Sequence, residues 1–194
     1  GFALPSFQLY ANTLHDKVNL MKLVSVNVAT PKEVNINGEE VLTGIYKAPV
    51  QEATWARFLG LDGDNQADKK VHGGPHQAVY CYPFEHYAFW QNSLSRQDLS
   101  VATFGENFTI SGLSEDNVCI GDVLKMGKAT FQVTMPRIPC FKLAHKLGDK
   151  TMTKQFLHSG RSGFYCRVLT EGTPQEIAAD PRVREVYLGE AEHA

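Results

Sequence analysis

Several short segments of the chain alternate apolar and polar residues, which is the pattern of a β-strand with one buried face. In the segment 22–29, every second residue from Val24 to Val28 is valine, whereas Ser25 and Asn27 between them are polar. Successive side chains of a strand point to opposite faces, so the valines share one face. The pattern predicts a half-buried strand over 22–29.

The segment 118–135 predicts a β-hairpin. Its second half alternates strongly, because apolar residues at positions 129, 131, 133 and 135 are separated by threonine or glutamine. Gly127 lies between the two halves, VCIGDVLKM and KATFQVTM, and glycine is typical of tight turns. We therefore expect two antiparallel strands joined near Gly127.

Further elements follow from the same rules. Asn37-Gly38 is a turn signal, and a strand is predicted after it over 41–50. Proline after a predicted strand at 77–82 favours a helix start, and the spacing of apolar residues predicts a helix over 83–94. The remaining predicted elements are helices over 140–147 and 152–158, a strand over 163–169, a helical turn over 174–179 and a last strand over 183–189.

The predicted strands outnumber the helices and occur in hairpin-like runs rather than in regular β–α–β units. This order predicts a mainly β fold, an antiparallel β-barrel or sandwich with a few short helices. A clean strand pattern begins only after Met21, so we interpret residues 1–20 as an N-terminal extension or expression remnant; the alternative is a genuine N-terminal strand. Residues 21–194 are then expected to form a single domain.

Composition narrows the classes of function. The 194-residue chain has 43% hydrophobic and 21% charged residues, which is typical of a globular domain. Its formal net charge of −2 lacks the basic excess of a protein that binds nucleic acid or a membrane surface, so neither partner is expected. No apolar run approaches the ~20 residues of a membrane helix. The N-terminus does not resemble a secretory signal, so a cytoplasmic location with reduced thiols is expected.

One of the four cysteines lies in a setting that favours a reactive thiolate, and none of them forms a Cys-x-x-Cys pair. Cys140 begins a helical pattern that Gly148 ends, and the N-terminus of a helix stabilises an anion. Arg137 and Lys142 add positive charge on either side. Such a thiolate is a good nucleophile and a soft metal ligand, and the alternative is a buried cysteine that acts as a small apolar residue. This structural role is expected for the other three, Cys81, Cys119 and Cys166.

Three loops are rich in residues that suit an anion or a metal ion. The first covers residues 60–76 and contains the adjacent glycines Gly73 and Gly74, which let backbone N–H groups turn toward a ligand. A calcium-binding EF-hand fails there, because Ala67 replaces the required glycine and Gly73 replaces the closing glutamate.

A zinc site from His72 and His76 is an alternative for this first loop. The glycines and proline between the two histidines disfavour a helical metal-binding pair. The second loop covers 104–112, where the amide of Asn107 suits the edge of a heterocycle, unless the segment is a plain turn between strands.

The third loop, 158–165, combines Ser159, Arg161 and Ser162 with two glycines, a composition suited to binding phosphate. The alternative is a flexible surface turn. The chain contains neither a Walker loop nor a Gly-x-Gly-x-x-Gly fingerprint, so a nucleoside triphosphatase or a nicotinamide dehydrogenase is not indicated. A Gly-x-Ser-x-Gly elbow is also absent.

Five motifs occur in a fixed order. They are GIYKAPV (44–50), LGLDGDNQADKKVHGGPHQAVYCYPFEHY (59–87), FGENFTISGLSEDNVCIGD (104–122), PRIPCFKL (136–143) and SGRSGFYCRVL (159–169). With them, the chain over about 22–170 resembles the MOSC domain, the C-terminal domain family of molybdenum-cofactor sulfurases. It is most similar to the stand-alone bacterial branch linked to resistance against N-hydroxylated purine bases. Phe141 stands where tryptophan is common in the family, and Pro75-His76 replaces a more polar pair. Neither difference removes the cysteine, so they affect the expected shape of the substrate rather than the expected activity.

The resemblance implies a β-barrel-like fold and an essential cysteine at Cys140. This cysteine ligates molybdenum in the molybdoenzyme members and carries sulfur in the sulfurase-type members. The resemblance also implies anchors for molybdopterin, the phosphate-bearing pterin of the molybdenum cofactor: Gly73, Gly74, Asn107, Arg137, Lys142, Ser159, Arg161 and Ser162. His72 and Asp64 are expected near the metal, as candidate proton donors to a departing hydroxyl.

These implications favour a molybdenum-dependent reductase of N-hydroxylated bases or amines. The chain has no iron–sulfur cysteine pattern and no flavin fingerprint, so electrons are expected from a separate partner reductase. One alternative is a non-redox sulfur or cofactor carrier that uses Cys140, and another is a binding module whose motifs are only structural. The reductase and the carrier both require a single cavity lined by Cys140, Arg161 and the 72–74 loop. The binding module does not require it.

Overall fold

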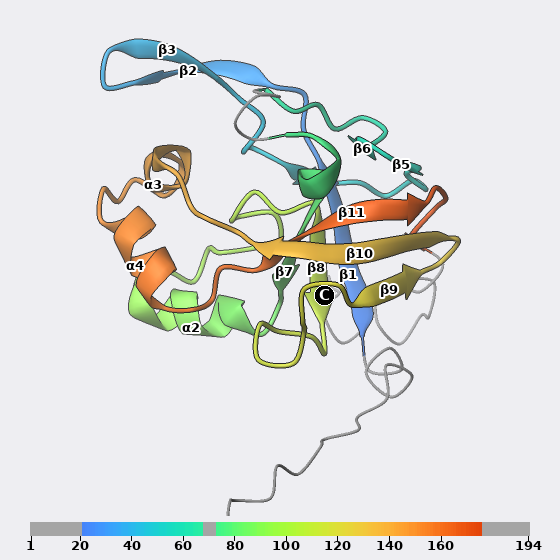
Figure 1. Ribbon diagram of the computed structural model, residues 1–194. Coiled ribbons are helices and arrows are strands. Elements are labelled where there is room, and N and C mark those ends of the chain that lie inside the picture. Colours follow the sequence, from blue (N-terminus) through green and yellow to red (C-terminus); the bar gives the residue numbers. More distant parts are fainter. Residues whose placement is uncertain (1–20, 68–72, 176–194) are drawn as a thin grey trace, which may run out of the picture.

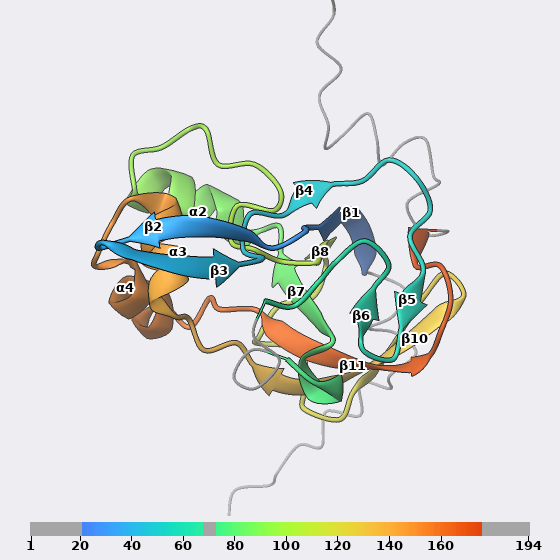
Figure 2. The same ribbon diagram turned by 90° about the horizontal axis from the view of Figure 1, so that it is seen from above.

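The computed structural model describes residues 21–67 and 73–175. Some predictions concern residues outside these ranges: the extension 1–20, His72, the helical turn 174–179 beyond residue 175, and the strand 183–189. The described chain forms one seven-stranded sheet and two small hairpins, with three α-helices gathered at one end of the sheet (Figures 1 and 2).

In chain order the strands are β1 (Lys22–Val28), β2 (Lys32–Ile36), β3 (Glu39–Thr43), β4 (Ala48–Pro49), β5 (Ala56–Arg57), β6 (Gly60–Leu61), β7 (Val79–Pro83), β8 (Phe108–Ser111), β9 (Val123–Met126), β10 (Ala129–Pro136) and β11 (Phe164–Thr170). The helices are the short 3-10 helix η1 (Pro75–Gln77) and the α-helices α2 (His86–Ser93), α3 (Phe141–Leu147) and α4 (Met152–His158). The order of strands in the large sheet is β4-β1-β8-β7-β11-β10-β9.

The prediction of a mainly β fold with a few short helices is confirmed. The sheet is mixed rather than wholly antiparallel, because β7 and β8 run parallel, with Cys81 opposite Phe108. Parallel neighbours need a crossover connection, and α2 lies within this one. Among the described residues the sheet ends at β4 and β9 without closing, so the expected barrel is corrected to an open mixed sheet.

Strand β7 separates two hydrophobic cores. Val79 and Cys81 belong to the larger core of the sheet, whereas Tyr80 and Tyr82 pack into a core that includes Trp90 of α2. This division follows from strand geometry, in which successive side chains point to opposite faces. The Tyr82 hydroxyl accepts a hydrogen bond from Trp90 Nε1 at 2.7 Å, so the buried polar atoms of both rings are paired.

Strand β1 contains a β-bulge that disrupts the predicted alternation of valines. Its pairing with β8 shifts register just after Leu23, where Val24 is the extra residue. Leu23 and Val26 are therefore the buried apolar residues, and Val24 is only half-buried. Asn27 was predicted on a polar face, but it is fully buried and donates to Thr109 Oγ1 at 3.3 Å.

The predicted turn at Asn37-Gly38 is confirmed. Both residues have positive φ, 56° and 93°, as a type I′ hairpin turn requires, and they join β2 to β3 in a hairpin that extends beyond the sheet (Figure 1). The strand predicted after the turn ends at Thr43 and does not continue to residue 50. A Cβ at the following Gly44 would lie 3.0 Å from the Asn65 carbonyl oxygen, so the chain passes close to a neighbouring loop there.

The hairpin predicted over 118–135 is confirmed in β9 and β10, which bury Ala129, Phe131 and Val133. The three predicted α-helices are also present, and Gly148 follows α3 with φ of 70°, as expected for a glycine that ends a helix. In the part of the chain that the structure describes, no helix is long and apolar enough to cross a bilayer.

Candidate functional site

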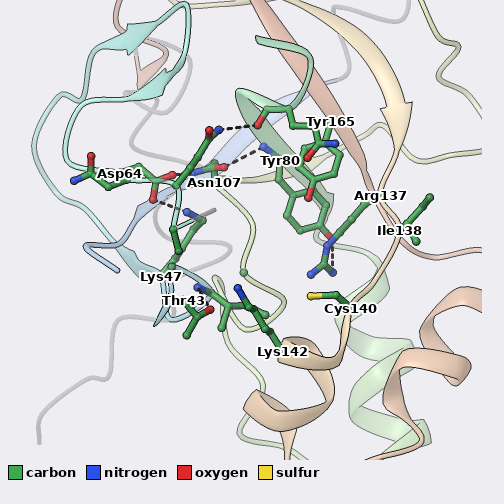
Figure 3. A pocket seen from close by; sticks show the side chains of 17 residues that line it. Thr43, Lys47, Asp64, Tyr80, Asn107, Arg137, Ile138, Cys140, Lys142 and Tyr165 are labelled. Carbon is green, nitrogen blue, oxygen red and sulfur yellow. Dashed lines mark hydrogen bonds and ion pairs between the residues drawn. The ribbon is translucent and has the colours of Figure 1, made fainter. Parts of the chain in front are cut away.

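A cavity of about 120 Å³ lies beside the start of α3, between the base of the β2–β3 hairpin and strand β7 (Figure 3). A cavity of this size holds several water molecules or part of a small ligand. Predicted site residues from three separate segments line its wall: Asp64, Asn107, Arg137, Cys140 and Lys142. The structure therefore brings together the sulfur, both of its neighbouring cations and two of the predicted polar side chains.

Cys140 occupies the N-cap position of α3, as predicted for the start of a helix. Its backbone is extended, with φ of −122°, and its carbonyl oxygen accepts the Leu143 N–H at 3.0 Å. The side chain is half-buried and lines the cavity, and its sulfur points toward the Arg137 guanidinium (Figure 3). The sulfur is therefore placed to contact a ligand and does not belong to either hydrophobic core.

Arg137 is a buried cation on the cavity wall. Its guanidinium lies 4.7 Å from the centre of the Tyr80 ring and 5.4 Å from that of Phe156, and Nη1 donates to the Tyr80 hydroxyl at 3.4 Å. Burial lowers the pKa of Arg137, but Tyr80, Tyr165 and Cys140 together raise it above the ordinary value. No carboxylate within the described ranges forms an ion pair with it. Because an unneutralised buried charge is costly, this wall favours an anionic ligand.

Lys142 is a second cation on the cavity wall, and it is half-buried. It lies in the first turn of α3, and its Nζ donates to the Leu42 carbonyl oxygen at 3.1 Å. It too has no carboxylate partner among the residues with described positions. The cavity wall is therefore locally cationic, although the whole chain has a formal net charge of −2.

Asp64 is fixed by a network of hydrogen bonds in the cavity wall (Figure 3). Its carboxylate forms an ion pair with Lys47 and accepts the Ala29 backbone N–H and the Asn107 side-chain N–H, both at 2.8 Å. The Asn107 side-chain oxygen accepts the Tyr80 backbone N–H at 3.1 Å. The amide of Asn107 therefore ties β7 to the Asp64 loop, which differs from its expected role at the edge of a heterocycle.

Glu106 is a positioning residue beside Asn107 that the local sequence pattern did not indicate. It is fully buried, and it accepts hydrogen bonds from the hydroxyls of Tyr87 and Thr109 and from the backbone N–H groups of Ala102 and Phe104. These four donors fix the loop that presents Asn107 to the cavity. The only signal in the sequence is a carboxylate between two phenylalanines in the segment FGENF.

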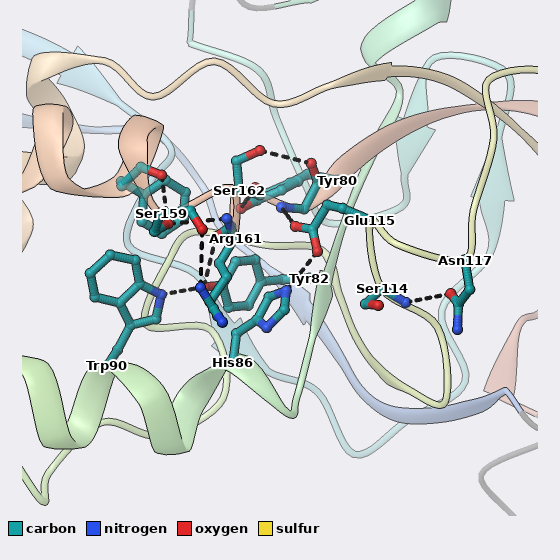
Figure 4. Close-up of polar contacts among 12 residues, drawn as sticks. Tyr80, Tyr82, His86, Trp90, Ser114, Glu115, Asn117, Ser159, Arg161 and Ser162 are labelled. Carbon is teal, nitrogen blue, oxygen red and sulfur yellow. Dashed lines mark hydrogen bonds and ion pairs between the residues drawn. The ribbon is translucent and has the colours of Figure 1, made fainter.

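The loop residues predicted to bind phosphate do not line the cavity: Ser159, Arg161 and Ser162. Their loop lies behind two tyrosine rings, because the Ser162 carbonyl accepts the Tyr80 hydroxyl at 2.7 Å and the Arg161 carbonyl accepts the Tyr82 hydroxyl at 3.2 Å (Figure 4). The Arg161 guanidinium lies 4.2 Å from the Phe89 ring centre. The expectation that one cavity is lined by Cys140, Arg161 and the 72–74 loop is therefore wrong for Arg161.

The two adjacent glycines also lie outside the cavity wall. The Gly74 N–H donates to Gln66 Oε1 at 3.3 Å, and Gln66 itself lines the cavity, so Gly73 and Gly74 border the site without facing it. His72 lies outside the described residues. Within 21–67 and 73–175, no group of three or more His, Cys, Asp or Glu side chains is arranged to hold a metal ion.

The buried structural role predicted for the other cysteines agrees with the structure at Cys81 and Cys166 but not at Cys119. Cys81 and Cys166 are buried in the larger core with their sulfur atoms 3.9 Å apart. Burial raises the pKa of the Cys166 thiol, which favours its protonated form. Cys119 is exposed and is not part of the cavity wall.

Lys146, on α3 below the cavity, is expected to make stability depend on pH. Its ammonium donates to two backbone carbonyl oxygens at 2.7 and 3.0 Å. Burial is the main cause that lowers its pKa to about 8, from an ordinary 10.5. Because the folded pKa is the lower one, the unfolded chain binds more protons between these two values, and the Lys146 contribution to stability increases as the pH rises through that window.

We therefore expect the stability difference between wild type and Lys146→Met to change in favour of the wild type between about pH 7.5 and about pH 9.5. Urea denaturation at both pH values measures the change. Lys154→Met, at an exposed position of α4, is the matched control and should show no such change. Equal pH dependence in the wild type and the Lys146 variant would contradict the prediction.

Comparisons with known proteins identify relatives of this chain. The sequence model of the MOSC domain family matches residues 68–184 of this chain. The uncharacterized protein YflK of Bacillus subtilis (strain 168) is 48% identical over 150 residues, which cover 77% of this chain and 67% of YflK. The crystal structure of YiiM from Geobacillus stearothermophilus matches with a TM-score of 0.65 and 38% identity, over 79% of this chain and 70% of that chain.

A third relative carries a functional name. A protein of Gibberella moniliformis (strain M3125 / FGSC 7600) named "Reductase" is 35% identical over 138 residues, which cover 70% of this chain but 24% of that protein. The matched family model and the identity to YflK and YiiM show the family. The chain belongs to the MOSC domain family.

Proposed function

We propose that this protein is a molybdenum-dependent reductase of N-hydroxylated bases or amines. The observation that carries the proposal is the cavity wall, where the Cys140 sulfur lies beside the buried Arg137 guanidinium, which no described carboxylate neutralises. Membership of the MOSC family and the fungal relative named "Reductase" support an oxidoreductase.

The side chains of the wall suit the molybdenum cofactor. A cysteine thiolate is a soft ligand of the kind that joins the dithiolene sulfurs of molybdopterin on molybdenum. Arginine and lysine suit its phosphate, and Arg137 and Lys142 face the cavity without carboxylate partners among the described residues. Cys140 would hold the metal, and Arg137 and Lys142 would hold the phosphate.

When bound, the cofactor supplies the two-electron chemistry that cleaves an N–O bond. The residues of the chain bind and orient the substrate next to Cys140 and limit the access of water to it. A separate reductase would supply the electrons, because the sequence contains neither an iron–sulfur cysteine pattern nor a flavin fingerprint.

Metal and pterin analysis tests the proposal. Protein purified from a host that synthesises the cofactor should contain molybdenum and pterin in equal amounts and should reduce an N-hydroxylated purine with an artificial electron donor. Protein from a host deficient in cofactor synthesis should do neither. Absence of both metal and turnover in the first preparation would overturn the proposal, and sulfane sulfur on Cys140 without molybdenum would favour a sulfur carrier.

A pair of matched variants tests the phosphate anchor. Lys142→Ala should lower cofactor retention about 10-fold or more, because a hydrogen bond to a charged group contributes about 1.5–3 kcal/mol. Arg161→Ala should leave retention unchanged, because Arg161 does not line the cavity. Pterin content per chain measures both. An equal loss in the two variants would show that the 159–163 loop binds the phosphate after all.

A further inference from the structure

Lys47 lies on the cavity wall, in the segment between β3 and β4 that contains the motif GIYKAPV (44–50). Its Nζ forms an ion pair with Asp64, and the side chain is 10% exposed. Nζ has no second hydrogen-bond partner among the residues whose positions the structure describes. An ammonium group carries three N–H donors, so Lys47 has donors left for a ligand in the cavity (Figure 3).

Asp64 holds Lys47 in place and is itself held by two further donors. Besides Lys47, its two oxygens accept the Ala29 backbone N–H and the Asn107 side-chain N–H. Three donors from the protein make this carboxylate a fixed acceptor in the wall, whereas the family resemblance implied a proton donor. In this ion pair, the group that carries transferable protons is the ammonium of Lys47.

The surroundings of Lys47 favour release of a proton. Burial is the main cause that lowers the pKa of Lys47, and the charges of Asp64 and Glu106 oppose it without restoring the ordinary value of 10.5. The titratable and charged groups around Lys47 are Asp64, Glu106 and Lys146 and, along the same cavity wall, Tyr80, Arg137, Cys140, Lys142 and Tyr165.

We propose that Lys47 is the proton donor to the hydroxyl group that leaves the substrate, and that Asp64 is a positioning residue for its ammonium. This inference rests on the proposed function, because it assigns a step of the same reaction. It is carried by the position of Nζ in the cavity wall, its ion pair with Asp64, and the N–H donors that the described residues leave without an acceptor.

The step balances as RNH–OH plus two electrons and two protons, which give RNH₂ and water. The N–O bond breaks, and the two electrons come from the partner reductase through the bound cofactor. The leaving oxygen takes one proton from Lys47 Nζ and departs as water, and the nitrogen takes the second proton from solvent. Lys47 then regains its proton from water, which reaches its 10% exposed side chain.

Two substitutions at Lys47 separate proton donation from a purely electrostatic role. Lys47→Arg keeps a cation that can pair with Asp64, but a guanidinium does not release a proton near neutral pH. Lys47→Gln removes the charge altogether. Proton donation predicts that both variants lose kcat by about 100-fold to about 10,000-fold, which is the usual contribution of general acid catalysis. Lys154→Arg, on the exposed face of α4, is the matched control with unchanged kcat.

A second measurement needs no turnover. In cofactor-free protein, competitive acylation followed by mass spectrometry reports the pH at which each lysine becomes a reactive amine. The midpoint for Lys47 should lie below that of the exposed Lys154, and Asp64→Asn should lower it further, because Asp64 stabilises the ammonium.

The possible outcomes are distinct. The assignment of Lys47 is supported if the wild type turns over, all variants contain normal amounts of molybdenum, and both Lys47 variants lose kcat. An active Lys47→Arg enzyme overturns it and leaves the proposed function intact, as does a Lys47 midpoint equal to that of Lys154. A wild-type protein without molybdenum or turnover removes the proposed function, and the role of Lys47 with it.

Discussion

Replacing Cys140 with serine is expected to abolish molybdenum retention and reductase turnover. Serine has almost the same shape, but its hydroxyl is a hard, weakly acidic ligand where a soft thiolate is needed. The side chain lies half-buried at the N-cap of α3, so the change should leave the fold intact. We expect metal affinity to fall by about 100-fold or more, beyond the loss that changes to supporting residues usually cause.

Metal content per chain and turnover measure this effect, and the circular dichroism spectrum checks the fold. Cys119→Ser is the matched control, because Cys119 is exposed and lies outside the cavity wall. That variant should keep both molybdenum and activity. A Cys140→Ser protein that retains the metal would show that the cofactor is held by other residues and would remove Cys140 from the centre of the proposed site.

The substitution Gly163→Ala is expected to destabilise the fold severely. Gly163 has φ of 70°, and a Cβ there would lie 2.4 Å from the Cys81 carbonyl oxygen and 2.8 Å from Tyr80 Cε2. The obstructing atom is backbone of β7, which cannot move aside without breaking the sheet. We expect the free energy of unfolding to decrease by about 3–5 kcal/mol, because up to about 3 kcal/mol of overpacking adds to about 1–2 kcal/mol for a left-handed alanine.

Gly160 offers a control with the same backbone conformation. Its φ is 68°, but a Cβ there would meet no atom within 4 Å. Gly160→Ala should therefore reduce stability only by the strain of a left-handed alanine, about 1–2 kcal/mol. Urea denaturation of the two variants separates steric conflict from backbone strain. Similar losses at both positions would mean that the 159–163 loop can move away from β7.

Local sequence was sufficient where a segment buries one regular face. The alternation of β10 and the final Gly148 of α3 predicted those elements, because both signals arise within a few residues. Strand β8 (Phe108–Ser111) was missed, since all four of its residues are buried and show no alternation. Its parallel pairing with β7 depends on contacts between distant segments, which no local pattern contains.

The residues of the candidate site also divide into those that local sequence predicts and those that depend on contacts between distant segments. Arg137, Cys140 and Lys142 lie within six residues of one another, so local sequence was enough to place them together. Lys47 was not singled out, because its importance arises from a partner 17 residues away in the chain. The composition of the 159–163 loop suits phosphate, but hydrogen bonds from two buried tyrosines direct that loop behind the cavity instead.

Because Trp90 lies in the smaller of the two cores, its fluorescence can be used to follow that core. Of the protein's two tryptophans, Trp90 is buried among the aromatic rings behind the cavity, whereas Trp55 is 40% exposed beside Arg57 of the β5–β6 hairpin. A Trp55→Phe variant would leave Trp90 as the single tryptophan, hydrogen-bonded through its indole nitrogen to the Tyr82 hydroxyl. The emission maximum and lifetime of its fluorescence would then report loosening of the core that contains Trp90, separately from the larger core of the sheet and without an added label.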